Sequence, residues 1–243
     1  MTVVTFDFWN TIARLPPGAM SEARERAVAA ACEAAEVEIE AELLRASLEG
    51  VGLSWERAWA AGHHLHPREG AEALVRALGV EGAAREMVAG AFLGAGREVT
   101  LQLAPDIRPC LERLGERGIR AGIVCDVGFS GGELLRELLA REGLLDHFGG
   151  WGFSDEVGHY KPSPQIFEAA LGALEAGPEE AVHVGDLRRT DVAGAAALGM
   201  RTVRYRGLHD DPDLDAGPEA DAVLDRHLEL SGLIERLDGQ GPA

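Results

Sequence analysis

Acidic and basic side chains in this sequence stand directly after short apolar runs, at the places where buried strands would end. In open sheets of parallel strands, ligands bind at the carboxyl ends of the strands. Carboxylates and an ammonium group gathered at such an edge can hold a metal ion, supply a nucleophile and bind an anion. The candidate residues are Asp7, Cys125, Asp126, Lys161, Asp186 and Asp191.

Three of these aspartates, Asp7, Asp186 and Asp191, would repel one another at a single point. Carboxylates a few ångströms apart raise each other's pKa unless a cation, or Lys161, lies among them. A hard divalent cation removes the repulsion, and Mg²⁺ fits best because it takes oxygen ligands and keeps water that a phosphate can displace. The residue types therefore predict a Mg²⁺ site that receives a small, anionic substrate.

The elements that must carry these residues alternate between strands and helices. The first run, TVVTFDF, is β-branched and aromatic, as expected of a buried strand. From Ala104 onward, helices are predicted over residues 106–117, 133–141 and 163–174, with a last helix closing the chain. The segments that alternate with them are IRAGIVC, WGFSDEV, AVHVGD, RTVRY and an edge strand in ADAVLD. This alternation predicts an α/β fold with a parallel sheet.

A helical segment separates the first strand from the rest of this sheet. From about Ser21 to Gly96 the residues are mostly Ala, Glu, Arg and Leu, and apolar positions such as Val28 and Cys32 recur at helical spacing. Ser21 is predicted to cap the first of these helices, and Pro67 suits the first turn of another. The histidines of AGHHLHP have no acid or cysteine at ligand spacing and predict a polar turn rather than a metal site.

Composition and charge exclude several classes of partner. The 243 residues, 46% of them hydrophobic, suffice for a core domain with a smaller inserted one. A net charge of −18 without a basic cluster argues against nucleic acid and anionic membranes. Neither a signal peptide nor an apolar stretch of about 20 residues is visible. Three widely spaced cysteines suggest neither a disulfide framework nor a zinc site, so we expect a cytoplasmic protein.

The order of these motifs resembles the haloacid dehalogenase-like hydrolase superfamily over essentially the whole chain. The matching pieces are DFWNT, IVCD, Lys161 in GHYKPSP, and GDLRRTD. The helical segment lies where that superfamily inserts its helical cap. The resemblance implies a Rossmann-like parallel-sheet core formed by residues 1–13 and 97–243, and a mostly helical cap formed by residues 14–96.

The resemblance also implies roles for the charged residues. Asp7 would be the nucleophile and would form a covalent aspartyl intermediate. Asp7, Asp186 and the main-chain carbonyl of Trp9 would bind Mg²⁺, with Asp191 either a further ligand or a partner of metal-bound water. Lys161 would stabilise Asp7 and the incoming anion.

Two positions depart from the pattern of the superfamily's phosphatases. The position of Trp9 carries an acid–base aspartate in those enzymes, and tryptophan can neither give nor take the proton. The position of Cys125 normally offers a Ser or Thr hydroxyl, which is a stronger hydrogen-bond donor. Trp9, Asn10, Thr11, Cys125 and Asp126 are implied to surround the substrate, with Thr11 in the turn that supports the nucleophile. Asp126 either binds substrate or caps the following loop.

Three functions follow from this combination. The leading hypothesis is a Mg²⁺-dependent hydrolase of phosphate esters or acyl phosphates with an altered acid–base position. An aromatic residue at the position of Trp9 also occurs in the superfamily's metal-independent 2-haloacid dehalogenases, but the paired carboxylates of GDLRRTD argue against that chemistry. The third hypothesis is a binding or regulatory protein that keeps the fold and has lost turnover.

Overall fold

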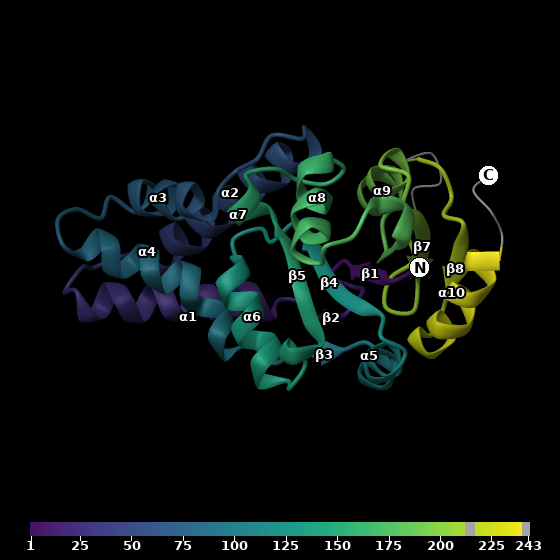
Figure 1. Cartoon of the computed structure of the whole chain (residues 1–243). Coiled ribbons are helices and arrows are strands. Elements are labelled where there is room, and N and C mark those ends of the chain that lie inside the picture. The colour runs from purple at the N-terminus through teal and green to yellow at the C-terminus, as the bar shows by residue number, and fades with distance from the viewer. Residues whose placement is uncertain (212–216, 240–243) are drawn as a thin grey trace. The chain divides into compact units, whose positions relative to one another are not determined.

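The chain divides into two compact units in a computed structural model that describes residues 1–211 and 217–239 (Figure 1). The α/β unit consists of Met1–Arg14, Gln102–Asp126 and Leu139–Ala243. The helical unit consists of Leu15–Leu101 and Val127–Leu138. The final residues of the predicted core, 240–243, lie outside the described residues. The structure groups residues 127–138 with the helical unit, whereas the sequence assigned them to the core.

Six parallel strands form the main sheet, in the order β5-β4-β1-β6-β7-β8. Their bounds are β1 Val3–Phe6, β4 Arg120–Cys125, β5 Phe148–Phe153, β6 Ala181–Gly185, β7 Arg201–Tyr205 and β8 Ala222–Leu224. A separate antiparallel pair joins β2 (Ala13–Arg14) to β3 (Gln102–Leu103). The helices that contact the sheet complete an α/β fold, as the sequence predicted.

The first strand lies in the middle of the sheet, and its four side chains, all apolar except Thr5, are fully buried. Phe6 pairs with Ile123 of β4 on one side and with Val184 of β6 on the other. This register brings the ends of three strands to one edge, and Asp7 is the residue that immediately follows β1. The pairing therefore delivers the predicted site residues of β1, β4 and β6 to neighbouring positions.

Helices pack on both faces of this sheet (Figure 1). Helices α8 and α9 contact the strands on one face, and α5 with α10 covers the other. The helical elements after β3 are α5 Ile107–Glu116, α6 Gly132–Arg141, η2 Leu145–His147, α7 Ser154–Val157, α8 Pro164–Ala173, η3 Pro178–Glu180, the π-helix η4 Arg188–Val192, α9 Ala193–Ala197, η5 His227–Glu229 and α10 Leu230–Gly239.

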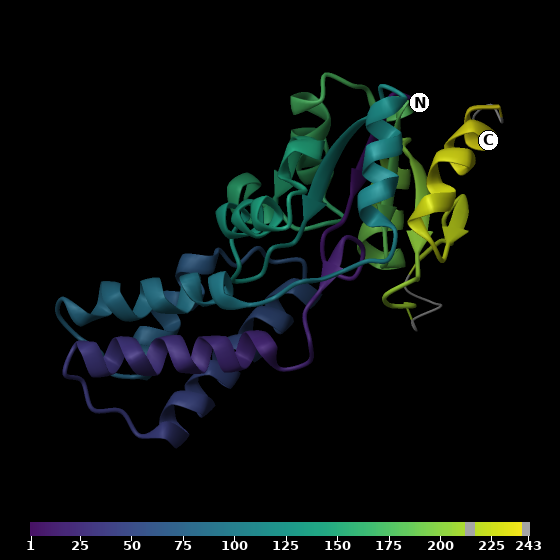
Figure 2. The ribbon, with the colours of Figure 1, turned by 90° about the horizontal axis from the view of Figure 1, so that it is seen from below.

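The helical unit has an apolar core of its own. Its helical elements are α1 Ala19–Ala34, α2 Ala41–Ala60, α3 Pro67–Ala77, α4 Ala84–Gly94 and η1 Ala95–Glu98. Helices α1 and α4 run side by side in Figure 2 and contact each other along their length. Val28, Leu74, Val88, Phe92 and Phe129 are buried in one cluster, so the segment after β4 contributes to this core.

Two local expectations about helix starts have different outcomes. Pro67 begins α3 as predicted, and His66 caps it by accepting from the N–H of Arg68 while Glu69 accepts from the N–H of His66. His66 is therefore the N-cap of α3, and the predicted polar turn over the histidines stays a prediction. The prediction that Ser21 caps the first helix is wrong, because α1 already begins at Ala19 after Gly18, whose φ of 79° only glycine adopts easily.

The strand predicted in WGFSDEV is displaced. Strand β5 begins at Phe148, and Ser154–Val157 forms the short helix α7 instead. The sequence pattern missed the start of this strand because α8 lies very close to it. Close packing of this kind requires glycine, which has a low strand propensity. A Cβ atom at Gly152 would stand 2.0 Å from the carbonyl oxygen of Ile166 in α8, and one at Gly150 would stand 2.6 Å from that of Ala170.

Replacing Gly152 with alanine tests this backbone contact. We expect Gly152→Ala to lower the free energy of unfolding by about 1–3 kcal/mol, because α8 must move away from β5. Gly172→Ala in the same helix is the matched control, because no atom lies within 4 Å of the added methyl group. Chemical denaturation should show the control to be as stable as the original chain or slightly more stable. Equal stability of both variants would contradict the packing.

Candidate active site

A buried lysine joins two buried aspartates at the carboxyl edge of the sheet. Lys161 Nζ lies 2.5 Å from Asp7 Oδ1 and 2.6 Å from Asp191 Oδ1, and the three side chains are at most 7% exposed. The backbone N–H of Lys161 donates to Asp126 Oδ1 at 2.9 Å. The structure therefore brings together Asp7, Asp126, Lys161 and Asp191, which the sequence placed at four separate strand ends.

Asp191 is held by donors on both of its oxygens. Besides Lys161, His183 Nε2 lies 3.1 Å from Oδ1, and the N–H of Leu187 donates to Oδ2 at 3.0 Å. On the far side of the imidazole, Nδ1 of His183 lies 2.9 Å from the hydroxyl of Thr5. Because the carboxylate can only accept, Nε2 carries the proton and Nδ1 accepts from Thr5. A buried hydrogen-bond chain thus runs from β1 through β6 to Asp191.

The charges of this cluster depend on one another. Burial opposes the charge on Lys161, but Asp191 and Asp7 outweigh it and raise the pKa of Lys161 well above its ordinary value. Burial also works against the ionised form of Asp191, yet Lys161 and His183 hold its pKa below the ordinary range. Burial raises the pKa of Asp7 to about 7, with Lys161 opposing this rise and Asp191 adding to it. Lys161 and Asp191 therefore form the permanently charged pair.

Asp186 and Cys125 complete the edge. Asp186 is 3% exposed, and burial raises its pKa well above the ordinary value, with the charges of Asp7 and Asp191 adding to the rise. Cys125 is fully buried at the end of β4, and burial raises the pKa of its thiol well above the usual range. A thiol in that state is a weak donor and not a nucleophile.

The residues after Asp7 form a tight turn. The N–H of Asn10 donates to the carbonyl of Ala13 at 2.8 Å, and Asn10 has a φ of 59°, a left-handed conformation that asparagine tolerates. The Trp9 ring packs edge-on against Phe8, with ring centroids 4.7 Å apart. The carbonyl of Thr11 lies 2.9 Å from Nε2 of the buried His227, and this contact anchors the turn.

The Mg²⁺ site predicted for this edge of the sheet stays a prediction. Within the described part of the chain, no three side chains of His, Cys, Asp or Glu make a group that could hold a metal ion, and Lys161 lies between Asp7 and Asp191. However, Asp186 Oδ2 is buried without a hydrogen-bond partner, which is costly for a carboxylate. Asp186 with Asp7 and a main-chain carbonyl would fit a hard cation.

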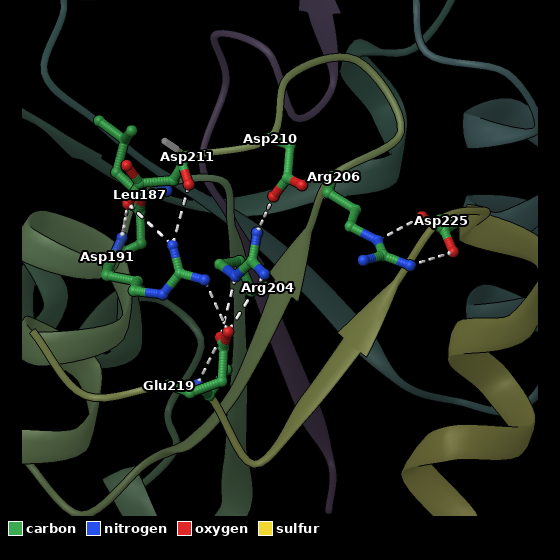
Figure 3. A network of polar contacts seen from close by, with 10 residues as sticks. Leu187, Asp191, Arg204, Arg206, Asp210, Asp211, Glu219 and Asp225 are labelled. Carbon is green, nitrogen blue, oxygen red and sulfur yellow. Dashed lines mark hydrogen bonds and ion pairs between the residues drawn. The ribbon is translucent and has the colours of Figure 1, made fainter. Parts of the chain in front are cut away.

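A network of arginines and acids ties the loop of Asp186 and Asp191 to the edge of the sheet (Figure 3). The N–H of Arg188 donates to Asp211 Oδ2 at 2.8 Å, and its guanidinium lies 2.8 Å from Glu219 Oε2. Arg204 of β7 donates to the other oxygen of Glu219 at 2.8 Å and also pairs with Asp210. Both arginines are buried, so this network fixes the loop through buried ion pairs in addition to the contacts of Asp191 with Lys161.

Sequence reasoning missed His183 and His227. His183 is the one polar side chain of AVHVG on β6, and an isolated histidine in an apolar strand is usually a packed core residue. The sequence did indicate that His183 lies near the site, because Asp191 follows eight residues later in a motif already assigned to the site. His227 had no such signal, since its contact with Thr11 spans 216 residues of sequence.

The fold and site define a class of enzyme in which a carboxylate at the end of the first strand lies beside a buried lysine. The chain belongs to the haloacid dehalogenase-like hydrolases, whose family model matches residues 1–199. None of the helices within residues 1–211 and 217–239 has the length and apolar character needed to cross a bilayer.

Relatives and solved structures agree with this assignment. A glyceraldehyde 3-phosphate phosphatase of Pyrococcus furiosus is 34% identical over 68% of this chain and 69% of its own length. A phosphoserine phosphatase of Thermus thermophilus is 37% identical over 73% of this chain and 68% of its own. The crystal structure of a 2-haloacid dehalogenase from Pseudomonas syringae has a TM-score of 0.69 and 25% identity, covering 98% of this chain and 99% of its own.

The proton on His183 can be observed directly. Burial lowers the pKa of His183, although Asp191 opposes the shift, so the ring is neutral at pH 7. We expect ¹H–¹⁵N NMR of the imidazole to show the Nε2–H form, which donates to Asp191. Thr5→Val removes the hydroxyl that donates to Nδ1, and we expect it to move the Nδ1 resonance while Nε2 stays protonated. A proton on Nδ1 in the original chain would contradict the assigned hydrogen-bond chain.

Proposed function

We propose that this chain is a Mg²⁺-dependent phosphatase that hydrolyses small phosphorylated molecules through a covalent intermediate on Asp7. The observation that carries the proposal is the buried ammonium of Lys161, 2.5 Å from Asp7 Oδ1 at the end of β1. A nucleophilic carboxylate needs a nearby cation to stay ionised in a buried site and to attract an anion. The phosphatase names of two relatives favour phosphate as the transferred group.

The reaction would proceed in two displacements at phosphorus. A carboxylate oxygen of Asp7 attacks the phosphorus, and the bond to the leaving oxygen breaks with its electron pair. Water then attacks the phosphorus of the aspartyl phosphate, the bond to Asp7 breaks, and the carboxylate is restored. Before each attack, Lys161 opposes the rise in the pKa of Asp7 and orients its carboxylate, because the position of Lys161 is fixed by Asp191 and by the N–H contact to Asp126.

Asp7, Asp186 and the main-chain carbonyl of Trp9 would hold Mg²⁺. When bound, the ion supplies positive charge that offsets the charge of the phosphoryl oxygens and of the two carboxylates. We assign Asp191 a positioning role instead of a ligand role, because Lys161, His183 and the N–H of Leu187 already engage both of its oxygens.

Trp9 restricts which leaving groups the proposed reaction can expel. No carboxylic acid at that position gives a proton to the leaving oxygen, so the oxygen must leave without help or take its proton from water. Asn10, Thr11, Cys125 and Asp126 would line the substrate, with the Cys125 thiol contributing little hydrogen bonding. Substrates with acidic leaving groups, such as aryl or acyl phosphates, would therefore react far faster than alkyl phosphates.

We further propose that the helical unit acts as the cap predicted from the sequence for residues 14–96, with the segment 127–138 added to it. A second candidate function is 2-haloacid dehalogenation without metal. It is favoured by the aromatic ring of Trp9 and by the likeness to the solved dehalogenase. The buried, unsatisfied oxygen of Asp186 disfavours it, because a metal-independent site leaves that carboxylate without a cation.

Removing the nucleophile tests the proposal. Asp7→Asn keeps the side-chain volume but removes the charge, and we expect hydrolysis of p-nitrophenyl phosphate to fall by about 10³-fold or more with the fold intact. Asp225→Asn is the control, since it changes an exposed acid paired with Arg206. EDTA should abolish activity in the original chain, and Asp186→Asn should require more Mg²⁺ for half-maximal rate. Activity of Asp7→Asn within a few-fold of the original would exclude Asp7 as the nucleophile.

Changing Trp9 separates the two candidate reactions. If only the acid–base group is missing, Trp9→Asp should speed hydrolysis of glycerol phosphate by about 10²-fold or more, while p-nitrophenyl phosphate changes less. Rates for both substrates, compared with those of Trp9→Phe, measure this change in leaving-group dependence. Loss of a metal-independent activity on 2-chloropropionate in Trp9→Asp would support the dehalogenase. No turnover of any of these compounds, with Mg²⁺ still bound, would indicate a binding protein.

A further inference from the structure

The helical unit contains a cavity whose walls belong entirely to that unit. Its volume is about 440 Å³, which is within the range of small-molecule sites. Helices α1, α2 and α4 and the segment after β4 supply the walls. The lining residues used below are Arg24, Arg45, Glu49, Glu56, Phe92 and Phe129.

Arg24 provides this cavity with a positively charged group whose hydrogen-bond donors are not all satisfied. Its Nε atom is buried and has no hydrogen-bond partner, and its Nη2 atom makes one long contact of 3.4 Å with Ser130 Oγ. Among the described residues, no carboxylate pairs with it. Its guanidinium instead lies over two aromatic rings, 5.0 Å from the centroid of Phe92 and 5.5 Å from that of Phe129.

An arginine in this state is prepared to bind an anion. Buried N–H donors without acceptors cost free energy, and a carboxylate oxygen would satisfy them. The planar guanidinium presents paired donors that match a carboxylate, and the two rings hold it in place. Burial lowers the pKa of Arg24 to about 10, so the group is still charged at neutral pH.

The other charges around the cavity limit the ligand to one negative charge. Arg45 is paired with Glu25 at 2.9 Å, so these two residues neutralise each other. Glu49 and Glu56 on α2 are exposed, where solvent screens them, but they would repel a second anionic group. The apolar surface of Phe92 and Phe129 favours a ligand with an apolar body.

We propose that this cavity binds a small organic acid, with a single carboxylate on Arg24 and an apolar body against Phe92 and Phe129. The proposal does not depend on the phosphatase reaction, because every residue it uses lies in the helical unit and none belongs to the site at the edge of the sheet. The proposed ligand of the helical unit is therefore a separate molecule from the substrate proposed for the site at the edge of the sheet.

Isothermal titration calorimetry with benzoate tests this proposal on the full chain. Benzoate offers one carboxylate and one ring, and benzamide is its neutral counterpart of the same shape. We expect benzoate to bind about tenfold or more tightly than benzamide, and more tightly than the dianion succinate. Arg24→Gln should weaken benzoate about tenfold or more, whereas Arg26→Gln, an exposed change on the same helix, should leave its affinity within about twofold.

Folding of each variant is checked by circular dichroism. If Arg24→Gln does not fold, Arg24→Lys keeps the charge but loses the paired donors and should bind benzoate with intermediate affinity. Three results would overturn the proposal. They are no benzoate binding at about 10 mM ligand, equal binding of benzoate and benzamide, or unchanged benzoate affinity in folded Arg24 variants.

Discussion

The buried ammonium of Lys161 between Asp7 and Asp191 is the interaction on which the site depends. The carboxylates of Asp7, Asp186 and Asp191 come close to one another there because β1 lies beside β6 in the sheet. Without a nearby cation, three buried carboxylates could not all be ionised. A buried ion pair of this kind adds little net stability over an apolar core, although removing one partner is costly. The arrangement is therefore better explained by chemistry than by stability.

Two sets of contacts keep that ammonium in place. The hydrogen-bond chain from Thr5 through His183 orients Asp191, and the arginine network around Glu219 holds the loop that carries Asp191. Neither set includes a residue of the turn that carries Trp9 and Asn10. The charged pair of Lys161 and Asp191 is therefore held by contacts that do not depend on that turn.

Residue types at strand ends were sufficient to predict Asp7, Lys161 and Asp191 as neighbours, because apolar runs mark strands and parallel strands share an edge. The same reasoning left open whether a cation or Lys161 lies among the carboxylates, and the structure places Lys161 between Asp7 and Asp191. The start of β5 could not be predicted from strand propensity, because its glycines are required by the close approach of the α8 backbone. His183 and His227 act through contacts with residues distant in sequence, which a local pattern does not reveal.

The most direct test of the central pairing is a double-mutant cycle of stability between Lys161 and Asp191. The free energy of unfolding would be measured at pH 7 in EDTA for Lys161→Met, Asp191→Asn and the double variant. We predict that Lys161→Met costs about 3–5 kcal/mol, and that adding Asp191→Asn restores part of the loss because one unpaired buried charge is removed. Losses that simply add, or a Lys161→Met variant as stable as the original chain, would contradict the account.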